Sequence, residues 1–374
     1  MASLTATQQA ALAATGSYSW TSGAIAQPFR PVAFSDLVDR VIGLLDADHI
    51  VVPNAAQFVR RAVAGLLAGH IILQGPPGTG KTTIAKILAQ AFEAELRIVT
   101  ATSEWSTYDV IGGLQPSVAG GFAPLLGAVP KAVLDCAQLV LDDSTGAAPH
   151  QAAWLLIDEF NRADIDKAIG PLYTVLSSTA AADLQRTPLE LWFESGVRRQ
   201  LWVPSRFRII GTMNDVDTSF VNAMSQGLTR RFQFISLLPA VGDAAVEVDA
   251  AFSQAAKRWQ SERGTAIQGD YRTVVSALSK MVEELRDPKT IGWPLGTAQV
   301  LDVIRATFIR TDGDEGNLTG PKVLDEAIAD IIVPQAGNLT IPKLESIRKL
   351  FESTAFPIAA KAVLHIENTS VTQL

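Results

Sequence analysis

The stretch Gly75-Pro-Pro-Gly-Thr-Gly-Lys-Thr82 decides the fold of this chain, because it follows the apolar run HIILQ and precedes the helical pattern TIAKILAQAF. A strand that ends in a glycine-rich turn and opens a helix directs backbone N–H groups and the positive helix end at phosphates. Lys81 adds a positive charge, and Thr82 adds a hydroxyl ligand for Mg²⁺. The stretch therefore predicts a P-loop. The residues expected to bind the nucleotide are Gly75, Pro76, Pro77, Gly78, Thr79, Gly80, Lys81, Thr82 and Thr83.

Composition restricts the kind of protein. The chain has 374 residues, of which 48% are hydrophobic and 18% charged, which is enough for two globular domains with sizeable cores. The net charge of −7 argues against a basic nucleic-acid platform over the whole surface, although it leaves a local basic channel open. Cys136 is the one cysteine and lies in the apolar pattern AVLDCAQLVL, so we expect it in a helix core.

Targeting signals are also missing from the sequence pattern. The N-terminal residues MASLTATQQAALAATGS have no basic segment and no long apolar stretch, and no apolar run elsewhere has the length of a membrane span. The four histidines are scattered and give no zinc spacing. We therefore expect a cytoplasmic protein without a membrane partner.

The order of apolar patterns divides the chain into three parts. Residues 1–33 are rich in Ala, Ser, Thr, Gln and Gly with little periodicity, which is typical of a mobile arm. Between residues 34 and 239 the β-type runs HIILQ, LRIVT, WLLIDEF, FRIIGTMN and FQFISL alternate with helical patterns. This alternation predicts an α/β domain with a parallel sheet flanked by helices. Residues 240–374 are dominated by helical stretches and predict a second, all-helical domain.

Three further elements indicate what is done with a bound nucleotide. The apolar strand WLLI is followed by Asp158 and Glu159, which suit the holding of Mg²⁺ through water and the orienting of an attacking water. Asn214 ends another apolar strand, where its amide is suited to reach the γ-phosphate; a turn residue is the other interpretation. Arg230 and Arg231 precede FQFISL, and an arginine there can neutralise the transferring phosphoryl group from a neighbouring subunit, whereas a surface salt bridge is the alternative.

Taken in order, GPPGTGKT, LLIDEFNRAD, IIGTMND and LTRRF resemble the Walker A, Walker B, sensor 1 and arginine-finger elements of the AAA+ ATPases. The sequence is most similar to the branch that holds MoxR-type chaperone ATPases and the GTP-driven motor of McrBC-type restriction systems. Asn161-Arg162 after the acids, YDVIGGLQP, GTMNDVD and the close around EAIADIIVPQ carry this closer resemblance. It implies an AAA+ core over residues 34–239 and a helical lid domain over residues 240–374.

Two segments resemble elements that the branch directs toward the pore of a ring. WSTYDVIGGLQPSVAGGFAPLLGAVP resembles an insert within helix 2, whose apolar side chains either contact a threaded substrate or pack internally. Those side chains are Trp105, Tyr108, Ile111 and Phe122. LELWFESGVRRQLWVP alternates apolar and polar residues around Ser195-Gly196, which predicts a hairpin. Arg198 and Arg199 near its tip either touch a polymer backbone or belong to a solvated loop.

The resemblance is weakest at sensor 2. Many relatives have an arginine at the start of a lid helix, where it contacts the γ-phosphate, but here the segment is Gly292-Trp-Pro-Leu-Gly-Thr-Ala298. Arg305 lies two turns further along the expected helix. It can replace the sensor 2 arginine only if the helix turns its side chain toward the nucleotide. Nucleotide sensing by the lid is therefore an open question of the sequence.

The resemblance implies an ATPase whose sites form between subunits of a ring, a hexamer in the simplest case, with Mg²⁺ as cofactor. ATP is favoured by the habit of the superfamily, and GTP is possible because no short motif marks base contacts. Three kinds of work stay open: a restriction-type motor that drives a nuclease partner along DNA, a MoxR-type remodeller beside a von Willebrand A-type protein, and a nucleotide-assembled scaffold. The insert and GTMND favour the first, the acidic charge favours the second, and Glu159 with Arg230-Arg231 argues against the third.

Overall fold

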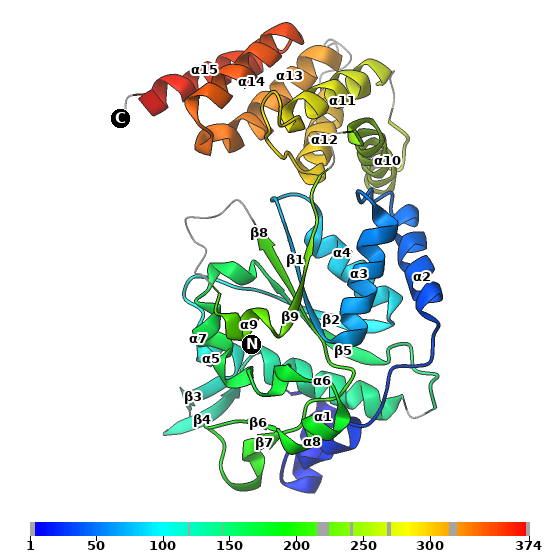
Figure 1. Ribbon diagram of the computed structural model, residues 1–374, viewed down its shortest axis with the longest axis vertical. Coiled ribbons are helices and arrows are strands. Elements are labelled where there is room, and N and C mark those ends of the chain that lie inside the picture. The colour runs from blue at the N-terminus through cyan, green and yellow to red at the C-terminus, as the bar shows by residue number, and fades with distance from the viewer. Residues whose placement is uncertain are drawn as a thin grey trace. The chain divides into compact units, whose positions relative to one another are not determined.

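The structure is a computed structural model that describes residues 4–118, 120–143, 145–214, 224–239, 242–267, 271–313 and 320–371. Its internal contacts divide the chain into two compact units. Unit 1 comprises Met1–Leu44, Ala56–Gly75 and Lys81–Ser236, and unit 2 comprises Leu45–Ala55, Pro76–Gly80 and Leu237–Leu374. The elements of both units are labelled in Figure 1.

Unit 1 is built on a five-stranded sheet in the order β2-β5-β8-β1-β9, in which every pair of neighbours is parallel. The strands are β1 (His70–Gly75), β2 (Ala94–Thr100), β5 (Ala152–Asp158), β8 (Ile209–Asn214) and β9 (Phe232–Ser236). The central strands are nearly continuous runs of buried apolar residues, as a sheet covered on both faces requires. The predicted parallel sheet is confirmed, and each of the five apolar runs forms one of its strands.

Helices flank this sheet (Figure 1). The longer ones are α2 (Phe34–Ala47), α3 (Ala55–Ala68), α4 (Lys81–Ala91) and α6 (Ala128–Asp142). Cys136 lies on α6 and is fully buried, as predicted, and burial raises the pKa of its thiol to about 12. The thiol is therefore a packing group rather than a nucleophile at neutral pH.

The N-terminal residues correct one expectation, because residues 4–33 do not have the character of a mobile arm. They form α1 (Ala6–Thr15) and a 3-10 helix, η1 (Ser19–Ala24), and they pack on unit 1. Tyr18 is 3% exposed and donates its hydroxyl to Glu194 at 3.0 Å. Phe29 contacts the rings of Phe92 and Trp154 edge-on. The sequence of the segment shows no helical or strand periodicity, because its apolar residues contact unit 1 one at a time and not as a continuous face.

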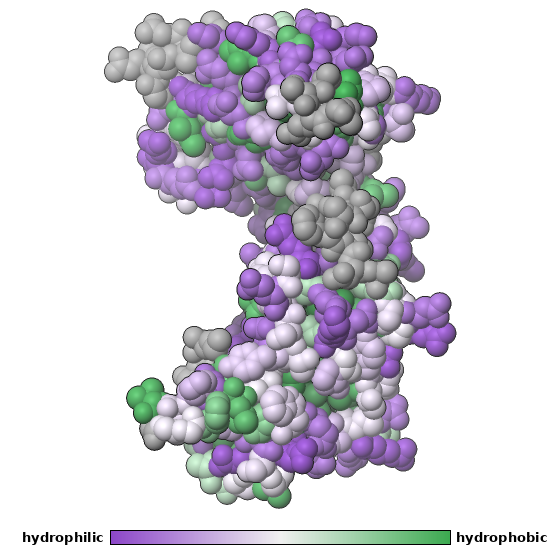
Figure 2. All heavy atoms as spheres, turned by 90° about the vertical axis from the view of Figure 1, so that its left-hand side faces the viewer, coloured by the Kyte–Doolittle hydropathy of each residue, from purple (hydrophilic) through white to green (hydrophobic). Residues whose placement is uncertain are grey.

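Two small hairpins extend from unit 1. β3 (Gly112–Pro116) and β4 (Phe122–Leu126) pair antiparallel, and so do β6 (Leu189–Glu190) and β7 (Gln200–Leu201). The second hairpin was predicted from sequence, although it pairs over only two residues on each side, whereas the first lies in the segment predicted as an insert with glycine turns. The apolar candidates of the insert differ in exposure: Phe122 is 72% exposed, Tyr108 is 36% exposed, and Ile111 is buried. Figure 2 shows the face that carries the β3-β4 hairpin, with hydrophobic side chains gathered among polar ones in its lower part.

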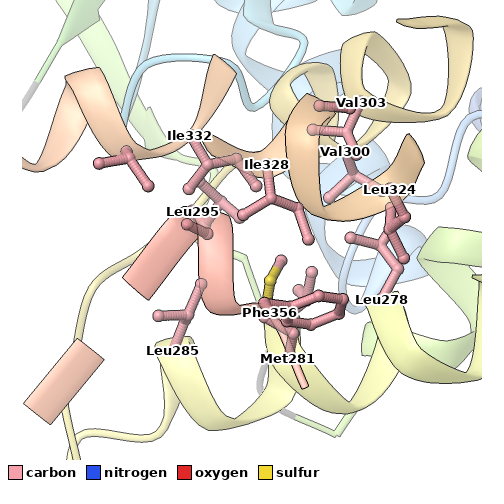
Figure 3. Close-up of a cluster of buried hydrophobic side chains, with 14 of the residues drawn as sticks. Leu278, Met281, Leu285, Leu295, Val300, Val303, Leu324, Ile328, Ile332 and Phe356 are labelled. Atoms are coloured by element: carbon pink, nitrogen blue, oxygen red, sulfur yellow. The ribbon is translucent and has the colours of Figure 1, made fainter. Parts of the chain in front are cut away.

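Unit 2 is helical throughout its described residues. Its elements are α10 (Ala244–Arg263), α11 (Arg272–Arg286), α12 (Thr297–Gly313), α13 (Gly320–Ile331), the 3-10 helix η6 (Val333–Asn338), α14 (Ile341–Ser353) and α15 (Pro357–Val371). A single apolar core joins them, in which side chains from α11, α12 and α13 meet (Figure 3). Among the residues that the structure describes, no helix is both long and apolar enough to cross a bilayer.

One polar cluster is buried in unit 2. Glu247 on α10 and Arg286 on α11 form an ion pair of 2.7 Å, and each side chain is 1% exposed. Thr297, the first residue of α12, donates its hydroxyl to Glu247 at 2.9 Å, and Arg286 donates to the carbonyl of Leu295 at 2.8 Å. This cluster fixes the chain where it enters α12.

Candidate functional site

The phosphate turn connects β1 to α4, as the sequence predicted. β1 ends at Gly75, five residues form the turn, and α4 begins at Lys81. Gly78 and Gly80 have φ angles of 78° and 80°, in the left-handed region that glycine adopts without a steric penalty. The hydroxyl of Thr79 donates to the carbonyl of Pro76 at 3.0 Å, which closes the turn. Alternating glycine conformations of this kind direct successive N–H groups to one side, where an anion binds.

Lys81 lies along the turn rather than in solvent. Its side chain is buried, with the residue 7% exposed, and the ammonium group donates to the carbonyl of Gly75 at 2.9 Å. A buried ammonium beside a turn of N–H groups supplies the positive charge that a triphosphate requires. Thr83, two positions after Lys81 on α4, is exposed.

The two predicted metal-binding residues lie together. Thr82 donates its hydroxyl to Asp158 at 3.0 Å, across the sheet edge from α4 to the end of β5. The described residues contain no group of three or more His, Cys, Asp or Glu that could hold a metal ion by themselves. One hydroxyl and one carboxylate nevertheless fit Mg²⁺, which takes oxygen ligands and is usually completed by water and substrate phosphates. Thr82 and Asp158 would hold that ion.

Glu159 follows directly at the end of β5 in an unusual conformation. Its φ and ψ are 56° and 43°, which is the left-handed region that non-glycine residues rarely occupy. Its amide donates to the hydroxyl of Thr212 at 3.0 Å, and its carboxylate forms an ion pair with Arg162 of the 3-10 helix η2 (Phe160–Arg162). A residue held in this strained conformation at a strand end is a candidate for function. The geometry suits the water-orienting role that we predicted.

Asn214 ends β8, the strand between β5 and β1. In the parallel register it lies opposite Gly75, the residue that opens the phosphate turn. Its carbonyl accepts a hydrogen bond of 3.3 Å from the side chain of Asn161. Asn214 is therefore at the same edge of the sheet, formed by the carboxyl ends of the strands, as the P-loop and the two acids. The remainder of the GTMNDVD motif, residues 215–217, lies outside the described residues.

Arg230 and Arg231 differ although they are adjacent. Arg231 donates to the carbonyl of Tyr173 at 2.5 Å, contacts that ring at 4.6 Å and also bonds the carbonyl of Gly227. Arg230 follows the short helix α9 (Gln226–Thr229), is exposed and has no ion pair or side-chain hydrogen bond among the residues described. The sequence left open which arginine serves a neighbouring site. The contacts favour Arg230, because Arg231 is already committed within its own chain.

Sequence reasoning missed Thr212. Its hydroxyl donates to Asp158 and accepts from the amide of Glu159, so it links both acids of β5 to β8. A threonine within the buried run IIGTMN was the available signal, because a buried hydroxyl needs a hydrogen-bond partner. Arg162 lies within the motif LIDEFNRAD, and no sequence pattern indicates that it pairs with Glu159.

Arg305 does not take the place of the absent sensor 2 arginine within unit 2. It lies on α12 and lines a small cavity with Arg258, Trp259 and Glu262. The side chain of α12 that bonds to the phosphate turn is that of Gln299, six positions earlier, and the amide of Ala298 bonds to the turn as well. Six positions correspond to about 600° of helical rotation, so the two side chains leave the helix in different directions.

Comparison with known proteins supports the same family. A family model described as "AAA domain (dynein-related subfamily)" matches residues 70–232, which contain the phosphate turn, Asp158, Glu159, Asn214, Arg230 and Arg231. Together with the McrB relative described below, this match supports an AAA+ ATPase domain of the McrB-like and MoxR branch over these residues. The family implies nucleotide hydrolysis in general and does not distinguish ATP from GTP.

Two curated relatives and one solved structure illustrate the range of similar proteins. The McrB subunit of the type IV methyl-directed restriction enzyme EcoKMcrB from Escherichia coli K12 is 30% identical over 175 residues, which is 46% of this chain and 35% of that protein. The Holliday junction branch migration complex subunit RuvB from Oenococcus oeni is 24% identical over 43% of this chain and 47% of its own length. The crystal structure of NtrX from Brucella abortus with ADP covers 83% of this chain and 64% of that one, at 14% identity and a TM-score of 0.48. The chain thus spans less than half the length of these two curated relatives.

Proposed function

We propose that this protein is a McrB-like motor that hydrolyses ATP or GTP at sites shared between neighbouring subunits of a ring, most simply a hexamer. The observation that carries the proposal is the contrast between two parts of unit 1. One edge of the sheet carries the residues that would act on the phosphates, namely Lys81, Thr82, Asp158 and Glu159. Arg230, in contrast, is exposed and has no ion pair or side-chain hydrogen bond with the described residues. A complete site then takes its arginine from the next copy.

Each residue of the site has a defined task in this proposal. The phosphate turn and Lys81 bind the β- and γ-phosphates, while Thr82 and Asp158 hold Mg²⁺, which would neutralise phosphate charge. Glu159 orients and polarises the attacking water, and Asn214 contacts the γ-phosphate or that water. Arg230 of the neighbouring copy stabilises the charge that develops on the transferring phosphoryl group.

The most direct test is steady-state hydrolysis of ATP and of GTP by the purified protein, with and without double-stranded DNA. Glu159→Gln serves as the blank, and Lys81→Ala tests binding. We expect Mg²⁺-dependent turnover that DNA stimulates and that both substitutions abolish, with loss of nucleotide affinity only in Lys81→Ala. Unchanged affinity of Lys81→Ala would refute the P-loop assignment, whatever the effect of DNA.

Stimulation by DNA would favour the restriction-type motor and a nuclease partner. The McrB subunit from Escherichia coli is described as part of a methyl-directed restriction enzyme, which supports a defence role by analogy. The described motifs of this chain include no separate DNA-reading element, so we propose that a partner protein supplies sequence specificity. A pull-down with the ring assembled on Glu159→Gln would identify that partner.

A second candidate function is MoxR-type remodelling of a protein, beside a von Willebrand A-type partner. The exposed apolar side chains on the two hairpins of unit 1 favour it, since Phe122, Trp192 and Val197 are 72%, 57% and 72% exposed. Apolar side chains at this exposure suit contact with an unfolded polypeptide more than with a phosphate backbone. Clear turnover that is indifferent to DNA would favour this candidate. A purely structural scaffold is the least favoured, because it has no use for Glu159 in its strained position.

A further inference from the structure

The helical turn that carries Arg230 is bonded at its N-terminus to a carboxylate from another helix of unit 1. Asp166 on α7 (Ile165–Ile169) accepts hydrogen bonds from the amide and the hydroxyl of Ser225, at 2.8 and 2.5 Å. Ser225 is in turn the N-cap of α9, where its hydroxyl accepts from the amide of Leu228 at 3.1 Å. Figure 1 shows α7 and α9 beside each other. Because α9 is only one turn long, such contacts from outside are what stabilise it.

Tyr173 contacts both ends of this turn. Its hydroxyl donates to the carboxylate of Asp166 and lies 3.3 Å from the hydroxyl of Ser225. Its ring contacts the guanidinium of Arg231 at 4.6 Å, and its carbonyl accepts from that side chain at 2.5 Å. A Cβ added at Gly227 would lie 3.5 Å from the same ring, so α9 packs directly on Tyr173. One aspartate and one tyrosine therefore hold the turn at its two ends.

Asp166 keeps its negative charge at neutral pH. Burial alone would raise the pKa of its carboxyl, but the hydrogen bonds from Ser225 and Tyr173 outweigh burial and hold the pKa below its usual value. Hydrogen bonds to an ionised acceptor are about twice as strong as those between neutral groups. The contacts of Asp166 are therefore strong enough to fix the place of the turn.

Arg230 ends the turn that is fixed in this way. Its amide donates to the carbonyl of Gln226 at 3.3 Å, so the position of its backbone follows from that of α9. Its side chain is exposed and has no ion pair or side-chain hydrogen bond with the described residues. A group that acts on a reacting phosphate has to be placed to within about 0.5 Å. For Arg230 this precision has to come from its backbone.

We propose that Asp166 is a positioning residue for Arg230, which it holds in place for the neighbouring copy through Ser225 and α9. The inference rests on the proposed shared site and deepens it, because it names the group that aims the arginine. Asp166 itself does not touch the nucleotide. Only residues 163 and 164 separate η2, which contains the ion-pair partner of Glu159, from α7. The segment after the acids of one site thus holds the arginine that serves the next site.

The test separates the copy that donates the arginine from the copy that hydrolyses. Arg230→Ala keeps the acids of its own site but cannot serve its neighbour. Glu159→Gln is inactive in its own site and still offers Arg230. Turnover of ATP or GTP with Mg²⁺ should therefore reappear when the two inactive variants are mixed, at each site where an Arg230→Ala copy receives the arginine of a Glu159→Gln copy. This recovered turnover is the reference.

Asp166→Ala is then added to one variant at a time. In the Glu159→Gln copy, which donates Arg230, it should lower the recovered turnover by about tenfold to a hundredfold, since a misplacement of about 1 Å can cost about a hundredfold. In the Arg230→Ala copy, which has no arginine to aim, it should leave the recovered turnover close to the reference. A merely structural role would lower turnover in both arrangements. Equal turnover in the two arrangements overturns the proposal.

Asp164→Ala is the matched control. Asp164 lies two residues before Asp166 and pairs with Lys167, and no hydrogen bond joins its side chain to α9 among the described residues. This variant loses the same charge and should leave the recovered turnover unchanged in both arrangements.

A second variant keeps the proposal testable if Asp166→Ala does not fold. Asp166→Asn keeps the size of the side chain and one acceptor oxygen, but its amide group cannot accept from Ser225 or Tyr173. It should show the same asymmetry to a smaller degree. Recovered turnover that is unchanged when the arginine donor carries Asp166→Asn overturns the proposal.

Failure of the proposed function gives a different result. In that case the unmodified protein turns over neither ATP nor GTP, or it is active while the mixture of Arg230→Ala and Glu159→Gln stays inactive. Either result rejects the shared site, and with it the arginine that Asp166 would position. Recovered turnover that does not depend on Asp166 in the donating copy refutes only the role of Asp166.

Discussion

The polar side chains at the strand ends of unit 1 are partly accessible, whereas those of the central cluster in unit 2 are enclosed. Glu159 keeps 27% of its side chain exposed and Arg230 is exposed, while Glu247 and Arg286 are each 1% exposed and bonded to each other. Accessible groups can meet a substrate, whereas a buried ion pair whose two members bond to each other supports the fold. The comparison teaches that substitutions in unit 1 should affect turnover with little loss of stability, and substitutions in the unit 2 cluster should do the reverse.

The largest effect is expected from Arg230→Ala. Turnover of the assembled protein should fall about a thousandfold or more, because an arginine that stabilises the transferring phosphoryl group contributes about 10³ to 10⁵ in rate. Stability should change by less than about 0.5 kcal/mol, since Arg230 is exposed. Turnover in mixtures with wild type, which should fall more steeply than the mutant fraction, provides the measurement. Strictly additive rates would place Arg230 outside a shared site.

Arg231→Ala is the matched control for that prediction. It removes the donor to the carbonyl of Tyr173, so we expect a loss of about 1 kcal/mol in the free energy of unfolding. Turnover should fall much less than in Arg230→Ala. Urea denaturation and steady-state assays of both variants separate the exposed arginine from the anchored one.

Glu159→Gln should lower kcat by a factor of about 10² to 10⁴, the usual contribution of a group that acts as general base. Nucleotide affinity and the urea midpoint should stay close to wild type, because the amide can retain the conformation of the strand end. Glu95→Gln, at an exposed position of β2, controls for the loss of one negative charge. Normal turnover of Glu159→Gln would show that Glu159 has no catalytic role. The contrast between a unit 1 site that controls turnover and a unit 2 cluster that controls stability would then lose its main support.

Arg286→Met should destabilise the protein by about 3 to 5 kcal/mol, because it leaves the carboxylate of Glu247 buried and uncompensated. The double variant Glu247→Leu, Arg286→Met should recover most of that loss, since neither charge remains. Chemical denaturation monitored by circular dichroism measures both. A mild effect of the single variant would show that the cluster is more accessible than its exposure indicates.

The last expected effect concerns acid stability in unit 1. Burial, and secondarily the charge of Arg208, lowers the pKa of His70 from 6.5 to about 3. The unfolded chain therefore takes up a proton below pH 6.5 that the folded chain refuses, and stability falls as the pH drops from 6.5 toward 3. Two pH units below 6.5 this amounts to about 3 kcal/mol.

His70→Gln tests the assignment of that loss. The glutamine oxygen can accept the hydrogen bond that the amide of Ile209 donates to the imidazole at 3.0 Å. Stability measured from pH 7 to 4.5 should fall by about 3 kcal/mol less in this variant than in wild type. Equal losses in the two proteins would mean that His70 does not control acid stability.

Sequence patterns were sufficient where a local arrangement has one physical solution. A glycine-rich turn between a strand and a helix places Gly78 and Gly80 at positive φ angles, and the structure has this turn, with Lys81 bonded to the carbonyl of Gly75. The anion-binding role of the turn stays a prediction. Buried parallel strands likewise have an apolar pattern without alternation, which identified all five strands of the sheet. The carboxyl ends of such strands lie at one edge, and this placed Asp158, Glu159 and Asn214 near the turn.

Patterns were insufficient where contacts join residues far apart in the chain. The N-terminal segment lacks periodicity, and nothing in it announces that Tyr18 reaches Glu194, 176 residues later. Arg230 and Arg231 are equivalent in sequence and separate only because Tyr173 and Gly227 provide carbonyls for one of them. The same is true of Thr212, whose partners are on β5.

The sequence by itself determined the phosphate turn, the parallel sheet and the helical second part, because each follows from propensities and periodicities within about 20 residues. Only the tertiary structure decided that residues 4–30 pack on unit 1, which of the two arginines is bonded to carbonyls of its own chain, and that Gln299 contacts the phosphate turn. These features depend on which backbone carbonyls and apolar surfaces lie opposite a side chain after folding. Such pairings between distant segments leave no periodic trace in the sequence.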